Sequence, residues 1–244
     1  MAAKPPSARS KDRRPNVVRS ASTRPKGFYA ILVLVAVLGA SILAYTMTRK
    51  PSTAAAPASL AASAATAGPA QGYLIGKPDA PVKILEFADF ECPACGRFAT
   101  ITEPDVRKNL IDAGLASLTF YDYPLPQHLN SQAASNAAAC ADDESKFWPM
   151  HDQIFGAQDQ WNTQATDNPK PMFMSYARAV GLDMARFEAC YDTRKHQKRI
   201  AANFAEGERR RVNSTPTFIV GDKQVANAIS YDELKKMVDE AAKK

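Results

Sequence analysis

The sequence predicts an α/β protein in which a long helical stretch interrupts the sheet-forming segments, preceded by one N-terminal transmembrane helix. Three observations lead to this expectation. Two stretches rich in branched and aromatic residues, 82–90 and 115–125, flank a segment with helical spacing. Residues 131–211 have helical patterns almost throughout, and a strand pair and a final helix follow them. An uncharged apolar run lies near the N-terminus.

The net charge of +6 is concentrated in the N-terminal part of the 244-residue chain. The first 50 residues contain ten Lys or Arg and one acidic residue, so the other 194 contain 21 basic and 24 acidic residues. A hydrophobic content of 45% is enough for a globular core. Nucleic-acid binding by the folded part would need a basic face, so its mildly acidic balance predicts no nucleic-acid partner.

Residues 1–27 form a basic tail, and "FYAILVLVAVLGASILAYTM" at 28–47 contains no charged residue. Twenty helical residues span about 30 Å, the thickness of the hydrocarbon core of a bilayer. Basic residues are more numerous before this run than after it, where only Arg49 and Lys50 are near. The positive-inside rule then predicts a single-pass anchor with a cytoplasmic N-terminus. A signal peptide cleaved in the alanine-rich stretch 54–66 is the alternative.

The linker that follows, 48–72, is rich in Ala, Ser and Pro and cannot form a core. The folded domain is therefore expected at 73–244, on the extracytoplasmic side of the bacterial cytoplasmic membrane.

The first half of this domain predicts a strand, a helix and a strand. The strand 82–90 is followed by a helix with apolar residues at near-helical spacing, which Gly114 ends. The strand 115–125 comes next, so the three elements predict a parallel βαβ unit.

In the second half, Ser131 and Asp183 are expected N-caps of helices within 131–211. A strand, a turn at Gly221-Asp222 and a short strand follow, and then a last helix capped by Ser230 or Asp232.

Cys92-Pro93-Ala94-Cys95 lies where the first strand becomes the helix. Unpaired N–H groups at a helix start stabilise a thiolate, which is the reactive form of cysteine, and Pro93 fits the first turn because its missing N–H is not needed there. A Cys-x-x-Cys beside a βαβ unit predicts a redox pair, with the sulfur of Cys92 at the exposed end and Cys95 one turn inward. The alternatives are an inert disulfide or half of a zinc site. The three histidines are scattered and there is no second such cysteine pair, so we expect no metal.

Three stretches together resemble the DsbA family of thioredoxin-fold disulfide oxidoreductases, in its membrane-anchored bacterial branch. They are "LEFADFECPACGRF" at 85–98, "KFWPMHDQIF" at 146–155 and "NSTPTFIVG" at 213–221. The resemblance implies a thioredoxin fold with a helical insertion at about 128–211. It also implies that the protein needs no bound cofactor.

The resemblance also implies roles for individual residues. Cys92 would attack and form mixed disulfides, and Cys95 would resolve them. Pro216 would be cis and face the pair, and Thr215 would offer backbone hydrogen bonds to an extended substrate peptide. Glu86 matches a buried acid beneath the active site and could relay the proton of Cys95. An exposed strand residue is the alternative for Glu86.

One departure concerns the residues between the cysteines, where the best-known oxidant of the family has a histidine at the position of Ala94. Alanine has no ring to stabilise the thiolate, so the sequence predicts a milder oxidant. Thr215 also precedes the cis-proline in several isomerases and reductases of the superfamily. The direction of electron flow is therefore open at this point.

The function implied is the introduction of disulfides into exported polypeptides that contain cysteines. A membrane quinone-linked thiol oxidase, DsbB-like or VKOR-like, would reoxidise the pair. A reductase or isomerase of the same fold, for example in cytochrome maturation, is the alternative within this chemistry. A redox-inert, tethered peptide-binding or chaperone module is the alternative from another class.

Cys140 and Cys190 fall in separate predicted helices of the insertion. The domain is expected outside the cytoplasm and the cysteine count is even, so these two cysteines are expected to form a structural disulfide. Some relatives in the family that the sequence resembles have similar disulfides. Two buried free cysteines are the alternative.

Other residues are expected to be structural. Phe147, Trp148 and Phe155 are expected in the helical core and not in a substrate groove. His128 follows the end of a predicted strand and is expected on a surface loop; the alternative is that it approaches the active site. The run 208–212, "ERRRV", is expected to be a solvated helix end.

Overall fold

The computed structural model describes residue 31, residues 34–41 and residues 68–243. It divides into two compact units, 1–51 and 52–244. The predicted basic tail and nearly all of the predicted linker lie outside the described residues, as does more than half of the predicted anchor. Residues 31 and 34–41 are helical. Within the described residues, no helix combines the length and the apolar character that crossing a membrane requires.

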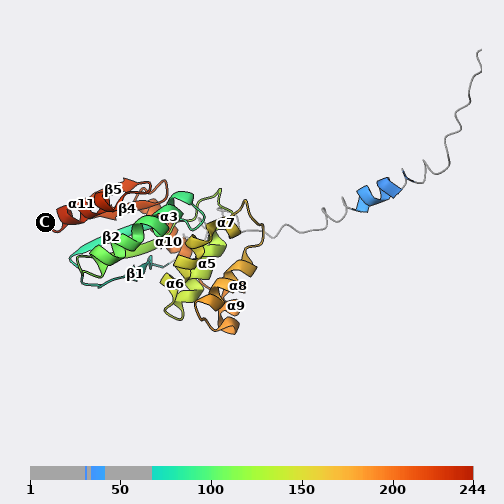
Figure 1. Cartoon of the computed structure of the whole chain (residues 1–244), viewed down its shortest axis with the longest axis horizontal. Coiled ribbons are helices and arrows are strands. Elements are labelled where there is room, and N and C mark those ends of the chain that lie inside the picture. The colour runs from blue at the N-terminus through green and yellow to red at the C-terminus, as the bar shows by residue number, and fades with distance from the viewer. Residues whose placement is uncertain (1–30, 32–33, 42–67, 244) are drawn as a thin grey trace, which may run out of the picture. The chain divides into compact units, whose positions relative to one another are not determined.

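A five-stranded sheet is the framework of the second unit (Figure 1). Its strand order is β1 (Tyr73–Ile75), β3 (Ala116–Asp122), β2 (Val82–Ala88), β4 (Thr217–Val220) and β5 (Lys223–Ala226). The central strand β2 pairs in parallel with β3 and antiparallel with β4, and β1 and β5 pair antiparallel at the two edges. The predicted parallel βαβ unit is therefore confirmed, whereas β1 was not predicted.

The connection between β2 and β3 is one helical segment that contains two wider, π-helical stretches. Its parts are α3 (Pro93–Arg97), η1 (Phe98–Thr102), α4 (Glu103–Val106) and η2 (Arg107–Ile111). Pro104 has no N–H to donate within the helix, and helices commonly depart from regular α geometry at such a residue. Gly114 follows with a φ of +73°, which glycine adopts at low cost, so the predicted end of the helix is confirmed.

Six helices lie between β3 and β4 and confirm the predicted insertion. They are α5 (Ser131–Asp142), α6 (Phe147–Gly156), α7 (Gln158–Trp161), α8 (Lys170–Ala179), α9 (Met184–Asp192) and α10 (Gln197–Arg209). Asp183 caps α9 by accepting from two backbone N–H groups. Ser131 is not a cap, because Asn130 occupies that position and the Ser131 hydroxyl donates to Asp89 instead.

The sheet has a helical layer on each face. Apolar residues of the helix that follows β2, together with α11 (Tyr231–Ala241), pack with β2, β3 and β4 in one core cluster. On the other face, α10 contacts β3. Helices α5, α6, α8 and α9 form a separate group beside the sheet (Figure 1). Ser230 starts α11 with a capping box, as one of the two predicted caps.

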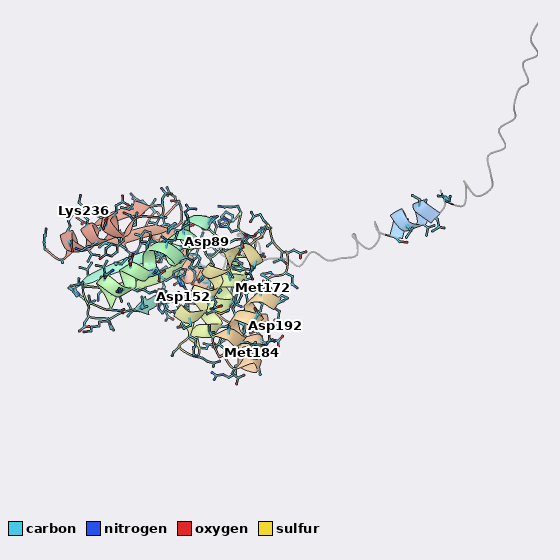
Figure 2. The ribbon with its side chains drawn as sticks, in the orientation of Figure 1. Asp89, Asp152, Met172, Met184, Asp192 and Lys236 are labelled. Carbon is cyan, nitrogen blue, oxygen red and sulfur yellow. A yellow bond between two sulfur atoms is a disulfide. The ribbon has the colours of Figure 1, made fainter. Side chains whose placement is uncertain are left out.

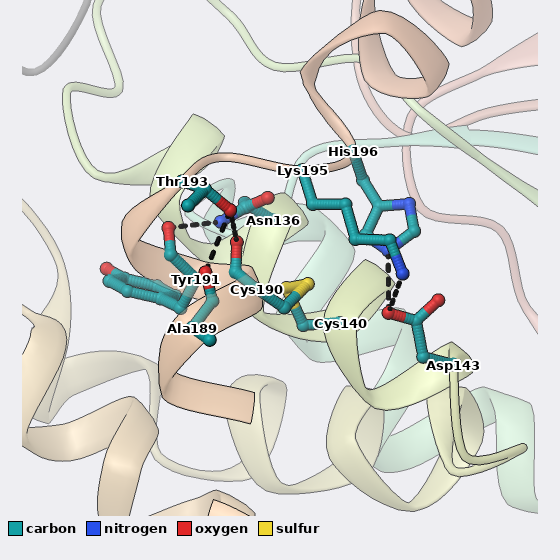
Figure 3. Close-up of a disulfide and its surroundings, with 9 residues drawn as sticks. All are labelled: Asn136, Cys140, Asp143, Ala189, Cys190, Tyr191, Thr193, Lys195 and His196. Carbon is teal, nitrogen blue, oxygen red and sulfur yellow. Dashed lines mark hydrogen bonds and ion pairs between the residues drawn. A yellow bond between two sulfur atoms is a disulfide. The ribbon is translucent and has the colours of Figure 1, made fainter. Parts of the chain in front are cut away.

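Cys140 of α5 and Cys190 of α9 form a disulfide, which is the pairing expected from the sequence (Figure 3). The same two helices are also joined by a hydrogen bond of 3.0 Å from Asn136 Nδ2 to Tyr191 O. Ligand atoms of Cys140, Cys190 and His196 lie within 4.8 Å of one another. Because both sulfurs are in the disulfide, neither is a thiolate that could bind a metal in this state.

We expect replacement of both Cys140 and Cys190 by alanine to lower the free energy of unfolding by up to about 4 kcal/mol, because the bridge closes a loop of about 50 residues in the unfolded chain. Guanidinium unfolding of the variant and of the wild type, both with Cys92 and Cys95 reduced, measures the difference. Equal midpoints and slopes would contradict a stabilising role for this disulfide.

Candidate functional site

Cys92 is the N-cap of the helix that follows the central strand. Its backbone N–H donates to Asp89 O at 3.0 Å, and its carbonyl accepts the first helical hydrogen bond from Gly96 N at 3.0 Å. The side chain of Cys95 is fully buried, and Cys92 is only 7% exposed. The order of exposure agrees with the sequence prediction, although Cys92 is more enclosed than expected.

The two thiols have opposite pKa shifts. A hydrogen bond from the Cys95 thiol, one from the Thr215 side chain and others from the backbone N–H groups of Cys95 and Ala94 lower the pKa of Cys92 to about 5, although burial opposes them. Burial, the hydrogen bond that it donates and the charge of Cys92 raise the pKa of Cys95 well above its usual value. A hydrogen bond from the Asp89 backbone lowers this pKa, and the charge of Asp89 makes a smaller contribution that raises it. At neutral pH the pair is therefore a thiolate at Cys92 and a thiol at Cys95.

Thr215 is the residue that the fold places against Cys92. The Cys92 Sγ lies 3.4 Å from Thr215 O, and the Thr215–Pro216 peptide bond is cis. The Cys92 thiol donates to the Thr215 carbonyl in this structure.

Gln158 of α7 fixes the chain on either side of the cysteine pair. Its Nε2 donates to Phe90 O at 2.7 Å and to Cys92 O at 2.9 Å. Gly96 makes this approach possible, because a Cβ at that position would lie 2.9 Å from Gln158 Oε1. Between the cysteines, Pro93 is exposed and Ala94 is partly exposed.

Asp89 connects the loop before Cys92 to the insertion and was not predicted as a site residue. Its buried carboxylate accepts four hydrogen bonds, two at each oxygen. Oδ1 accepts from Glu91 N at 2.8 Å and from Ser131 Oγ at 2.5 Å. Oδ2 accepts from Leu125 N and pairs with His128 Nδ1, both at 2.7 Å. Asp89 lies where the sheet meets the inserted helices (Figure 2).

Glu91 makes a second connection of the same kind. Its carboxylate accepts from Asn130 N at 2.9 Å and from Thr163 N. The amide of Asn130 in turn donates to Trp161 O and Thr166 O, both at 2.8 Å. The available sequence signal was two acidic residues, Asp89 and Glu91, within the three positions before Cys92, between an apolar strand and the helix, because carboxylates are rarely buried without partners.

Comparison with known proteins agrees with this architecture. The thioredoxin family model matches residues 69–240. The chain belongs to the thioredoxin family. Its fold is similar to that of DsbA proteins of known structure, as the sequence motifs indicated.

The relatives differ in length and in name. A protein described as probable disulfide bond formation protein D from Bacillus anthracis is 26% identical over 70% of this chain and 78% of its own length. Na(+)/H(+) antiporter NhaA 3 of Salinispora tropica is 33% identical over 64% of this chain, but the chain spans only 22% of that relative. Oxidised BdbD of Bacillus subtilis has the same fold, with a TM-score of 0.63 and 24% identity over 73% of this chain and 99% of its own.

In this DsbA-like structure His128 is not on a free surface loop, and that expectation was wrong. Its side chain is only 17% exposed, because its ring packs against Asp89. The partner that holds it is distant in the sequence, so local composition gave no indication of this contact.

Glu86 is 1% exposed, so the alternative of an exposed strand residue is wrong. Burial and the charge of Glu103 raise the pKa of Glu86 well above its usual value, and the charge of Arg107 opposes them. Asp89 is the carboxylate whose charge acts on Cys95. A proton relay from Cys95 through Glu86 stays a prediction.

The aromatic residues of α6 are in the core, as expected. Phe147 and Phe155 are 2% and 3% exposed. Trp148 is partly buried, donates from Nε1 to Leu74 O at 3.0 Å, and lies under the Arg107 guanidinium, which is 4.8 Å from its ring centroid.

We expect Glu86→Gln to gain stability relative to the wild type as the pH rises. The folded wild type retains a proton on Glu86 that the unfolded chain has released, so its stability falls from the ordinary carboxyl pKa upward to the raised pKa of Glu86. Glutamine does not titrate and removes this loss. Unfolding by urea at a series of pH values measures the difference, with the exposed Asp112→Asn as control. A difference that does not change with pH would contradict the raised pKa.

Proposed function

We propose that the folded domain catalyses thiol–disulfide exchange through Cys92 and Cys95 and introduces disulfides into exported polypeptides that contain cysteines. One observation carries this proposal: two cysteines one helical turn apart have opposite pKa shifts, and that of Cys92 is lowered to about 5. The exchange reaction passes through a mixed disulfide, and it requires a reactive thiolate next to a second thiol. Cys92, which is 7% exposed, and the fully buried Cys95 provide these two groups.

The reaction begins with the Cys92–Cys95 disulfide. A substrate thiolate attacks Cys92 Sγ, the bond between the two cysteines breaks, and Cys95 leaves as a thiolate that takes up a proton. A second substrate thiolate then attacks the substrate sulfur of the mixed disulfide and releases Cys92 as a thiolate. Two electrons pass from the substrate to the pair, and the substrate gains one disulfide.

The low pKa of Cys92 favours oxidation of the substrate over reduction. Hydrogen bonds that stabilise the thiolate stabilise the reduced pair, so the disulfide form is the stronger oxidant. The Thr215 carbonyl, 3.4 Å from Cys92 Sγ, is positioned to accept a hydrogen bond from an extended substrate backbone. The name of the Bacillus anthracis relative, a probable disulfide bond formation protein, points in the same direction.

The proposal places this domain outside the bacterial cytoplasmic membrane, held by an anchor at 28–47. The uncharged run and the excess of basic residues before it support this location. The apolar side chains of Leu34, Val35, Val37 and Leu38 are 55–61% exposed on their helix, as a lipid-facing helix requires. A quinone-linked membrane thiol oxidase, DsbB-like or VKOR-like, would reoxidise the pair.

We expect Cys92→Ser to abolish disulfide formation in a reduced test polypeptide. We expect Cys95→Ser, incubated with a polypeptide that contains a disulfide, to accumulate a mixed disulfide at Cys92, because the Cys92 thiolate attacks that disulfide and releases one substrate thiolate. The second variant retains the attacking sulfur but lacks the resolving one. Loss of free thiols and mass analysis of the trapped complex are the measurements. If Cys92→Ser still supports oxidation as well as the wild type, the catalytic assignment is wrong and the chaperone alternative is favoured. A Cys92–Cys95 pair that is mostly dithiol in cells would favour a reductase.

We expect the mature protein to retain residues 28–47 and to remain in the membrane fraction after alkaline extraction, because about twenty apolar residues span a bilayer. Intact mass and protease accessibility from the outer side of spheroplasts test this. Val35→Asp combined with Leu38→Asp should release the protein from the membrane. A mature chain that begins after residue 47 would show that the run is a signal peptide.

A further inference from the structure

His128 lies in the connection between β3 and α5 and contacts Asp89, which is three residues before Cys92. Its ring Nδ1 is 2.7 Å from Asp89 Oδ2, and its backbone N–H donates to Leu125 O at 3.1 Å. Leu125 N donates in turn to the same Asp89 Oδ2 at 2.7 Å. These three contacts fix both the backbone and the ring of His128 against one carboxylate.

Asp89 fixes Cys92 as well. Its carbonyl accepts the Cys92 backbone N–H at 3.0 Å, while its carboxylate holds the histidine ring. One buried residue therefore determines where both the sulfur-bearing residue and the imidazole lie. The positions of Cys92 and His128 are fixed relative to each other even though they are separated by β3 in the sequence.

The charges in this region favour an imidazolium. The hydrogen bond with Asp89 raises the pKa of His128, and the charges of Asp89, Glu91 and the Cys92 thiolate raise it further, while burial opposes them. Coupling between two charges is reciprocal, so a protonated His128 also favours the Cys92 thiolate. The hydrogen bonds from Cys95, Thr215 and the backbone remain the larger causes of the low pKa of Cys92. The effect of His128 therefore adds to theirs.

The geometry points to His128, held by Asp89, as the positioning residue that supplies a positive charge to the reduced Cys92 sulfur. This inference rests on the proposed function. His128 would take the place of the ring that the Cys-Pro-Ala-Cys sequence lacks at Ala94, but from a different segment of the chain. It would also balance the Asp89 carboxylate, whose charge otherwise acts against ionisation of the buried Cys95.

This arrangement predicts an unusual order of Cys92 alkylation rates among variants. His128→Gln removes the positive charge and leaves the Asp89 carboxylate unbalanced near both sulfurs. The combination of Asp89→Asn with His128→Gln removes both charges. Its Cys92 alkylation rate should be closer to the wild-type rate than that of His128→Gln alone. A purely structural role would give the opposite order, because the double variant loses more of the hydrogen bonds that hold the loop.

The test is the pH dependence of alkylation of Cys92 by iodoacetamide, measured on the reduced full-length protein in detergent. At pH values near 5, where Cys92 titrates, we expect His128→Gln to lower the alkylation rate by about threefold or more. The same variant should shift the equilibrium with glutathione by a similar factor toward the oxidised protein. His128→Lys, which retains a positive charge, should recover part of both effects.

Ser131→Ala is the matched control, because it removes another hydrogen bond to Asp89 without changing a charge. The inference is wrong if His128→Gln and Ser131→Ala have the same dependence of the alkylation rate on pH. It is also wrong if the alkylation rate of the double variant differs more from the wild-type rate than that of His128→Gln does. An unreactive Cys92 in the wild type would instead refute the proposed function, so the two failures are distinguishable.

Discussion

The buried carboxylate of Asp89 is the interaction on which the geometry of the site depends. A carboxylate removed from water is costly unless hydrogen bonds replace its hydration, and Asp89 accepts four. Two of its four donors belong to the connection between β3 and α5, a third is the hydroxyl of Ser131 at the start of α5, and the fourth is the nearby Glu91 N–H. The loop that carries Cys92 is therefore held by the insertion as well as by the end of β2.

Glu91 and Gln158 extend the same principle to the neighbouring backbone. Glu91 satisfies N–H groups of Asn130 and Thr163, and Gln158 satisfies the carbonyls of Phe90 and Cys92. Irregular backbone that is buried must find partners for its polar groups, and here side chains of the loop and of the insertion provide them. The insertion thus has a direct role in shaping the redox site, in addition to covering it.

Glu86 and Glu103 are two buried acids that, unlike Asp89, have too few hydrogen-bond donors. One carboxylate oxygen of each has no hydrogen-bond partner among the described residues, and Arg107 pairs with Glu103 and Asp152. The charge of Glu103 therefore raises the pKa of Glu86, and a proton on Glu86 relieves the repulsion between them. Asp89 has a hydrogen-bond donor at each of four acceptor positions, whereas Glu86 on β2 lacks such donors and is better suited to hold a proton.

The sequence was sufficient for the features that depend on local patterns. The alternation in β2, the glycine that ends the first helix and the Cys-Pro-x-Cys at a helix start are all encoded within a few residues. The contacts of Asp89 with His128 and Ser131 join residues 39 and 42 positions apart, so no local pattern reports them. Ser131 illustrates the difficulty, because a serine before a helical stretch is the usual sign of an N-cap, yet its hydroxyl is used by Asp89. The three-residue β1 was missed because its pairing with β3, and not its composition, makes it a strand.

The opposite shifts of the two thiols also decide how long a mixed disulfide survives. In the mixed disulfide, Cys95 can resolve the bond only as a thiolate, and burial keeps it protonated. Substrate thiolates in solution do not bear this cost, so release by the second substrate thiol, which completes oxidation, competes well against return of the substrate by Cys95. The burial of Cys95 therefore favours net disulfide formation, because it slows the attack of Cys95 on the mixed disulfide. This effect on a rate is independent of the equilibrium stability of the Cys92 thiolate.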